Sequence, residues 1–103
     1  MQLVVLGLNH KTVPVDIREQ FAISPDSARS GLIHLDEQEG IEEAVVLSTC
    51  NRTEIYAVLK DETAKETLYD FFLALSGNSE AKDEYFFYFE GEACIRHLFE
   101  VVS

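Results

Sequence analysis

The sequence predicts an α+β domain in which helices cover one face of an antiparallel sheet. Hydrophobic, β-branched runs and segments of helical periodicity follow one another in the order strand, helix, strand, strand, helix, strand, helix. Only three residues separate the two middle strands, which indicates a hairpin. This order is that of a ferredoxin-like βαββαβ sandwich with an antiparallel sheet, followed by a C-terminal helix.

The first half of the chain supplies one strand and two helical segments. Residues 2–8 form a run rich in Val and Leu, as expected of a buried strand. Pro14 lies just inside a short helical turn that reaches Phe21. Ser24 and Pro25 then open a second helix, because serine caps a helix and proline is tolerated at its first position.

The second half of the chain begins with the hairpin, whose strands are residues 43–49 and 53–59. In the helix that follows, Thr63 and Glu66 match a capping box, and Gly77 ends the helical run. The remaining elements are a strand at residues 85–89 and a helix at residues 90–102, which ends without a capping signal.

Length and composition limit the functions that the chain can have. With 103 residues, 47% of them hydrophobic, residues 1–103 are expected to form one domain with a modest core. A formal charge of −11 repels a phosphate backbone, so this piece alone should bind RNA poorly. Asn9 and His10 interrupt the first apolar run too early for a signal peptide or a membrane span, which predicts a cytoplasmic location and no membrane association.

The two cysteines differ in their surroundings. Neither Cys50 nor Cys94 has the spacing of a zinc ligand, so we expect no metal site and two free thiols. Cys50 lies in a polar tip two residues from Arg52, where a guanidinium can stabilise a thiolate; a small residue in a tight turn is the alternative. Cys94 falls on the apolar side of its helix and is interpreted as a packing residue.

Three further polar residues each have two interpretations. Arg52 suits a bidentate carboxylate clamp, or pairs at the surface with Glu54 on the same side of the strand. The Thr49 hydroxyl serves a substrate or the hairpin backbone. His97 has apolar helical neighbours, which favours a core histidine whose ring nitrogens have hydrogen-bond partners within the protein over a functional one.

The predicted topology brings separated segments together. In a ferredoxin-like sheet the first and second strands run the same way, so residues 7–10 and the tip at 49–52 should emerge at one edge. The last helix would return toward that edge and carry His97 within reach. Two motifs that are distant in sequence would then form one site.

Three segments carry a resemblance to one enzyme family. Residues 7–15 (GLNHKTVPV), with Arg18 and Glu19, resemble the opening signature of the glutamyl-tRNA reductases. Residues 47–56 (LSTCNRTEIY) are similar to the active-site segment of that family, and residues 96–99 (RHLF) resemble a third segment. The resemblance spans essentially the whole chain and is to the N-terminal catalytic domain.

This resemblance implies roles for individual residues. Cys50 would attack the α-carbonyl of glutamate esterified to its tRNA and form a thioester, which NADPH reduces to glutamate-1-semialdehyde, the precursor of 5-aminolevulinate and of tetrapyrroles. Thr49, Asn51 and Arg52 would hold the glutamyl group, with Arg52 on its side-chain carboxylate. His97 occupies a position that the family treats as important for activity.

The resemblance also implies partners and further domains. Glutamyl-tRNA would be the substrate of the full-length protein, and a C-terminal domain would make it a homodimer. No glycine-rich GxGxxG follows a strand, so the NADPH-binding domain, like the dimerisation domain, is expected outside residues 1–103, and this fragment should not complete the reduction. A non-catalytic, small-molecule-binding regulatory domain of the same fold is the alternative. A thiol redox protein is disfavoured because no resolving cysteine lies near Cys50.

Overall fold

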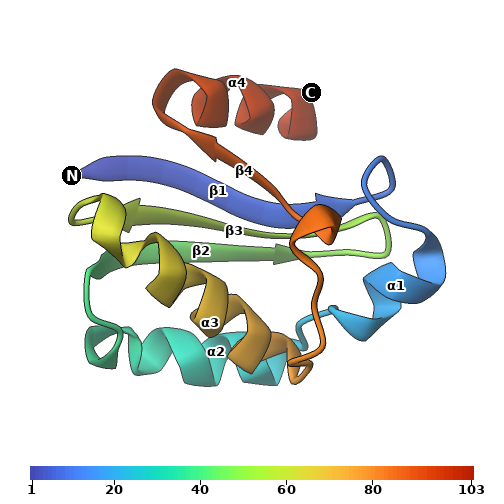
Figure 1. Cartoon of the computed structure of the whole chain (residues 1–103), viewed down its shortest axis with the longest axis horizontal. Coiled ribbons are helices and arrows are strands. Elements are labelled where there is room, and N and C mark those ends of the chain that lie inside the picture. Colours follow the sequence, from blue (N-terminus) through green and yellow to red (C-terminus); the bar gives the residue numbers. More distant parts are fainter.

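The structure, a computed structural model, describes all residues from 1 to 103 and is built on one four-stranded sheet (Figure 1). The strand order is β2-β3-β1-β4 and every neighbouring pair is antiparallel. This is the order of a ferredoxin-like sheet, so the predicted fold is confirmed. The strands are β1 (Gln2–Asn9), β2 (Ile41–Ser48), β3 (Arg52–Leu59) and β4 (Phe87–Glu90), and the helices are α1 (Val15–Gln20), α2 (Pro25–Ile33), α3 (Lys65–Ser76) and α4 (Gly91–Val102).

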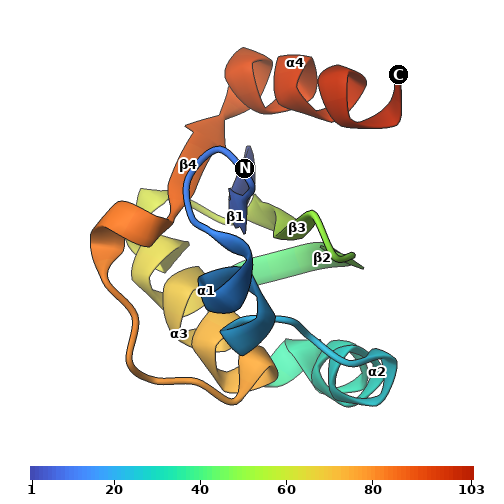
Figure 2. The same ribbon diagram turned by 90° about the vertical axis from the view of Figure 1, so that its right-hand side faces the viewer.

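The helices lie on both sides of the sheet. α2 and α3 lie side by side under one face, whereas α4 lies over β1 and β4 on the other face (Figures 1 and 2). α4 and α3 are the longest helices, with 12 residues each, and no helix has the length and apolar character that crossing a bilayer requires.

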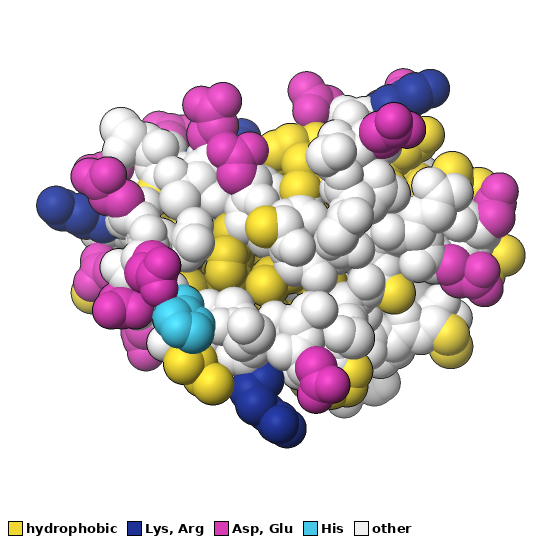
Figure 3. Space-filling view, turned by 90° about the horizontal axis from the view of Figure 1, so that it is seen from below, with side chains coloured by type: hydrophobic (Ala, Val, Ile, Leu, Met, Phe, Trp, Pro, Cys, Tyr) yellow, Lys and Arg dark blue, Asp and Glu magenta, His cyan; other side chains and the backbone are white.

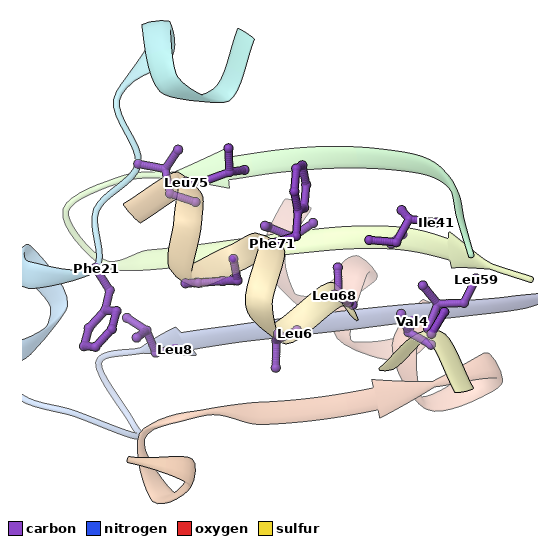
Figure 4. Packing of buried hydrophobic residues seen from close by; sticks show 14 of the residues in the cluster. Val4, Leu6, Leu8, Phe21, Ile41, Leu59, Leu68, Phe71 and Leu75 are labelled. Carbon is purple, nitrogen blue, oxygen red and sulfur yellow. The ribbon is translucent and has the colours of Figure 1, made fainter. Parts of the chain in front are cut away.

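The main core fills the space between the sheet and α3. Strand residues alternate between the two faces, so every second side chain of β1 and β3 points into this core. Figure 4 shows the side chains meeting between the strands and the helices. The buried members include Val4, Leu6 and Leu8 of β1, Ile55 and Leu59 of β3, and Leu68, Phe71 and Phe72 of α3, with Phe21 closing the end below α1.

The predicted helix starts are partly right. The Ser24 hydroxyl accepts a hydrogen bond of 3.1 Å from the Ser27 N–H, and Pro25 is the first residue of α2, as predicted. Pro14 is the N-cap of α1 and not a residue inside the helix. The capping box at Thr63 is wrong: a carboxylate two residues earlier, that of Asp61, accepts the Thr63 N–H at 3.0 Å.

The last strand begins later than predicted. Asp83–Tyr85 forms a 3-10 turn, so β4 starts at Phe87 and ends at Glu90. Tyr85 and Phe86 pack edge-on against Phe21, with ring centroids 6.2 and 5.7 Å apart, and so contribute to the core instead of the sheet. Aromatic residues suit either place, which is why their composition alone did not fix the strand boundary.

Acidic residues outnumber basic ones by 19 to 8, so the charged part of the surface is mainly acidic. On the face shown in Figure 3, acidic side chains are spread over the surface, whereas Lys and Arg side chains are few. A cluster of Lys and Arg side chains on this molecule would therefore indicate a site for an anionic ligand.

Candidate active site at the hairpin tip

The β2–β3 hairpin tip and the end of β1 form one continuous edge. Asn9 is paired with Arg52 in the sheet, and the His10 N–H donates to the Asn51 carbonyl at 3.2 Å. The tip is closed by the Thr49 N–H, which donates to the Arg52 carbonyl at 2.7 Å. The predicted convergence of the two motifs is therefore confirmed.

The turn after β1 is fixed by its own side chains. The Asn9 side-chain oxygen accepts from the Lys11 N–H at 2.9 Å, and the Thr12 hydroxyl accepts from the Asn9 N–H at 3.0 Å. The Asn9 carbonyl also accepts from the Val13 N–H at 3.0 Å. Asn9 is buried, and these hydrogen bonds join it to residues two to four positions away. Its role is therefore to hold the turn beside the tip.

Arg18 of α1 ties the turn to the tip. Its Nε donates to the Cys50 carbonyl at 3.3 Å and its Nη1 donates to the Val13 carbonyl at 2.9 Å. The guanidinium of Arg18 is thus anchored at the backbone of the cysteine, whereas that of Arg52 pairs with Glu54. In the sequence, Arg18 stands out only as part of the first resembling segment; its contact with Cys50 depends on the long-range packing of α1 against the hairpin.

Cys50 itself is an exposed free thiol. Thr49 and Asn51 on either side are exposed as well, and the Thr49 hydroxyl accepts from the Asn51 N–H at 3.2 Å. The sulfur is therefore not sealed in the interior, and the backbone on both sides of it is held by hydrogen bonds.

A cavity of about 470 Å³ opens beside the tip, between α4 and the turn after β1. Arg52 and His97 are on its wall, whereas Thr49, Cys50 and Asn51 are not. The structure thus brings two of the five predicted site residues to the cavity and leaves three on the exposed tip next to it. The other lining residues are Asn9, His10, Lys11, Thr12, Phe87, Phe89, Ala93, Arg96, Glu100 and Val101.

Arg52 and His97 both contact Glu54. Arg52 Nη1 lies 3.1 Å from Glu54 Oε2, and His97 Nε2 lies 2.8 Å from the same oxygen. The Glu54 side chain is completely buried, so the pair with Arg52 is not the exposed surface pair that was one of the predicted alternatives. The His97 ring also packs on Phe87 and Phe89, with centroids 4.8 and 5.3 Å apart, and its side chain is 11% exposed.

Cys94 lies in a different environment from Cys50. It is buried with Val5 and Tyr56 in a small cluster under α4, which confirms its predicted packing role. Burial, reinforced by the nearby Glu54 carboxylate, raises the pKa of the Cys94 thiol. Burial and the hydrogen bond to Glu54 also raise the pKa of Tyr56, so both groups stay protonated at neutral pH.

Comparison with known proteins identifies the family. A family model described as the N-terminal domain of glutamyl-tRNAGlu reductase matches residues 6–103. The chain belongs to this family. Among its relatives, the glutamyl-tRNA reductase of Exiguobacterium sp. is 45% identical over 105 residues, and that of Desulforudis audaxviator is 39% identical over 105 residues.

The glutamyl-tRNA reductase relatives are much longer than this domain. The matches cover 100% of this chain but 23% of either relative, so the chain spans about a quarter of their length. The solved glutamyl-tRNA reductase from Methanopyrus kandleri superposes with a TM-score of 0.69 at 28% identity, covering 96% of this chain and 21% of that one. The fold and the family are therefore established together.

The residues of this glutamyl-tRNA reductase domain do not fit a dinucleotide cofactor. Dinucleotide sites use a glycine-rich turn between a parallel strand and a helix, where backbone N–H groups meet the pyrophosphate. This sheet is antiparallel throughout, and its five glycines never form a GxGxxG turn. NADPH thus has no recognisable site among residues 1–103.

Positive charge in this domain gathers at the end that carries the tip. Lys11, Arg52 and Arg96 line the cavity, and Arg18 holds the Cys50 carbonyl, so half of the eight Lys and Arg residues lie at one end of the domain. Against a net charge of −11, this end of the domain offers an anionic ligand several cations.

Proposed function

We propose that this chain is the substrate-binding, nucleophile-bearing domain of a glutamyl-tRNA reductase. The Cys50 thiolate attacks the carbonyl carbon of glutamate esterified to tRNA. A C–S bond forms and the ester C–O bond breaks, so the glutamyl group becomes a thioester and the tRNA leaves as its hydroxyl after gaining a proton. The observation that carries this proposal is the exposed Cys50 thiol on a tip held by hydrogen bonds to β1 and α1.

The positive charge at the tip supports the nucleophilic role of Cys50. A thiolate and not a thiol attacks a carbonyl, and nearby guanidinium groups favour the thiolate. Arg18 is anchored on the Cys50 carbonyl, and Arg52 is two residues away in sequence. An ester already has a good leaving group, so the attack needs little help from a general acid.

Arg52 is proposed to bind the side-chain carboxylate of the glutamyl group. It uses Nη1 for Glu54, which leaves Nε and Nη2 to donate to a second carboxylate. The cavity that Arg52 lines, about 470 Å³, has room for a side chain the size of glutamate. The requirement for a planar fork is the reason to expect arginine here and not lysine.

The remaining predicted residues have supporting roles in this proposal. Thr49 and Asn51 flank the sulfur and offer a hydroxyl and an amide to the glutamyl group. His97 faces the cavity and touches the substrate as a hydrogen-bonding partner. Thr49 can do this while its oxygen still accepts the Asn51 N–H, because a hydroxyl both donates and accepts.

The second half of the proposed reaction is reduction of the thioester to glutamate-1-semialdehyde, for the synthesis of 5-aminolevulinate and tetrapyrroles. NADPH, when bound, supplies the hydride for that reduction. We assign its site to a part of the protein outside these 103 residues. The homodimer stays a prediction of the family resemblance, and the cytoplasmic location stays a prediction from the residues of the first apolar run.

Transfer of labelled glutamate from tRNA to protein tests the proposal directly. We expect the wild-type chain, incubated with glutamyl-tRNA carrying radioactive glutamate, to gain a label that hydroxylamine removes, as it removes any thioester. Cys50→Ser should abolish the label and Cys94→Ser should keep it. Circular dichroism of the two variants establishes that both remain folded.

Two results would refute this assignment. Label retained in Cys50→Ser would mean that another group is the acceptor. An unlabelled wild-type chain would mean that residues 1–103 do not carry out the transfer step, and that the fold serves binding alone.

A further inference from the structure

Glu54 is a fully buried carboxylate on the central strand β3, beneath α4. Its two oxygens accept from three donors: the Tyr56 hydroxyl at 2.8 Å on Oε1, and Arg52 Nη1 at 3.1 Å and His97 Nε2 at 2.8 Å on Oε2. Two of these donors lie on the cavity wall. The proposed reaction gives Glu54 no role, although it joins both residues.

Burial of this carboxylate is a built feature of the fold. A carboxylate removed from water costs several kcal/mol unless hydrogen bonds and opposite charge replace the water, and here three donors do so. The strand opposite also makes room for it: Gly7 is paired with Glu54, and a Cβ on Gly7 would lie 2.8 Å from Glu54 Cγ. Strand, hairpin and α4 all meet at this one group.

The hydrogen-bond pattern assigns protons to the His97 ring. An ionised carboxylate only accepts, so Nε2, at 2.8 Å, must carry a hydrogen. When the ring is neutral, Nδ1 is then without a proton and acts as an acceptor. In the same way Glu54 occupies one amino group of Arg52 and leaves its other donors for a ligand.

We propose that Glu54 is a positioning residue that holds Arg52 and His97 at the cavity wall and fixes His97 with its proton on Nε2. This role rests on the proposed function. Oε2 of Glu54 orients the Arg52 guanidinium, which is proposed to bind the glutamyl carboxylate, and it also orients the His97 ring toward the cavity. Glu54 itself does not touch the substrate. It acts through the two residues that do.

Nitrogen NMR of the 103-residue protein tests this role without any reductase assay. With ¹⁵N-labelled histidine, at a pH where the ring is neutral, His97 should show the Nε2–H tautomer and a large shift difference between its ring nitrogens. In Glu54→Leu that difference should fall toward the value of a tautomer mixture. In Glu54→Gln the amide oxygen still accepts from Nε2, so the Nε2–H form should persist.

Arginine side chains give the second readout. In wild type, Arg52 should show resolved guanidinium proton signals because Glu54 restrains it, whereas exposed Arg29, which has no side-chain partner, should show averaged ones. Glu54→Leu should make Arg52 resemble Arg29. Tyr56→Phe is the matched control: it removes a donor to Oε1 only, so both His97 and Arg52 should keep their wild-type signals.

Each outcome decides the proposal. A wild-type His97 with its proton on Nδ1 would overturn it even if every Glu54 variant failed to fold. So would a folded Glu54→Leu protein with unchanged His97 and Arg52 signals, since packing alone would then place them. Failure of glutamyl transfer with these NMR results intact would count against the proposed function and leave the positioning role standing.

Discussion

The two faces of the sheet bury very different groups. The face under α2 and α3 covers a cluster of 15 buried apolar residues, including Phe72, which is 0% exposed. The face under α4 has a buried cluster of three, Val5, Tyr56 and Cys94, and beside it the buried carboxyl group of Glu54. A single helix, α4, therefore covers the polar groups of the site, while the larger core lies on the opposite side.

The residues that stabilise the fold and the polar residues of the candidate site thus lie on different faces of the sheet. Apolar burial stabilises at roughly 25 cal/mol per Å², so the larger core supplies most of the stabilisation of the domain. The α4 face can then hold charged groups whose burial contributes little net stability. Substitutions in the larger core should therefore alter mainly the free energy of unfolding, and substitutions at the site should alter mainly its reactivity.

The largest effect is expected in the main core. Phe72→Ala should lower the free energy of unfolding by about 3–5 kcal/mol, because it removes a fully buried ring and leaves a cavity. Val45→Ala, in β2, where the residue is 64% exposed, should cost less than about 1 kcal/mol. Urea unfolding of both variants measures the difference, and equal losses would contradict the division between the faces.

Two glycines provide the next comparison. Gly7→Ala should destabilise the domain by about 1–3 kcal/mol, because its Cβ would meet Glu54 Cγ and the Thr53 carbonyl, both at 2.8 Å. Gly31→Ala, in α2, meets the end of the flexible Leu75 side chain and gains helix propensity, so we expect little net change. Thermal unfolding of the pair distinguishes them. A harmless Gly7→Ala would show that Glu54 has room to move.

Arg52 should give Cys50 a preference for anionic reagents. We expect Arg52→Lys to lower the ratio of alkylation rates with iodoacetate and iodoacetamide by about threefold, since lysine keeps the charge but loses the fork. Peptide mass spectrometry reports the rate at Cys50 alone. Arg29→Lys, an exposed site without a side-chain partner, is the control and should leave the ratio unchanged. An unaltered ratio in Arg52→Lys would remove the support for a carboxylate clamp.

The smallest effect concerns pH. The pKa of the Cys94 thiol is raised by burial, so above about pH 8.5, where an ordinary thiol ionises, the unfolded chain loses this proton before the folded domain does. Stability should therefore fall as pH rises from there toward the folded pKa, and be unaffected below it. Urea unfolding between pH 7 and about pH 10 should show a shallower fall in Cys94→Ala than in Cys50→Ala. Parallel curves would contradict this assignment.

Much of the fold follows from local patterns in the sequence. The hairpin, the Ser24 cap and the convergence of the tip with the end of β1 were predictable because alternation, capping and strand order are local or topological properties. The false capping box at Thr63 arose because Asp61, two residues earlier, offers a competing carboxylate. The sequence alone does not decide between two neighbouring residues when the side chain of either can cap the helix.

The site was only partly predictable for a different reason. The polar tip indicated Cys50 and Arg52 as candidates, with an alternative left open for each, and the apolar face of its helix indicated the packing role of Cys94. Glu54 entered only as the partner of Arg52 in one of two alternatives, a surface pair, because its burial depends on a glycine across the strand and on a helix some forty residues later. No periodicity in β3 contains that information.

The junction between β4 and α4 has a consequence for how this family can vary. The strand ends at Glu90 and the helix begins at Gly91, with no intervening loop to absorb a change in length. One residue inserted there would turn the helix by about 100° and carry the His97 ring off the Glu54 carboxylate. This junction is thus expected to tolerate substitution of its residues far better than insertion or deletion.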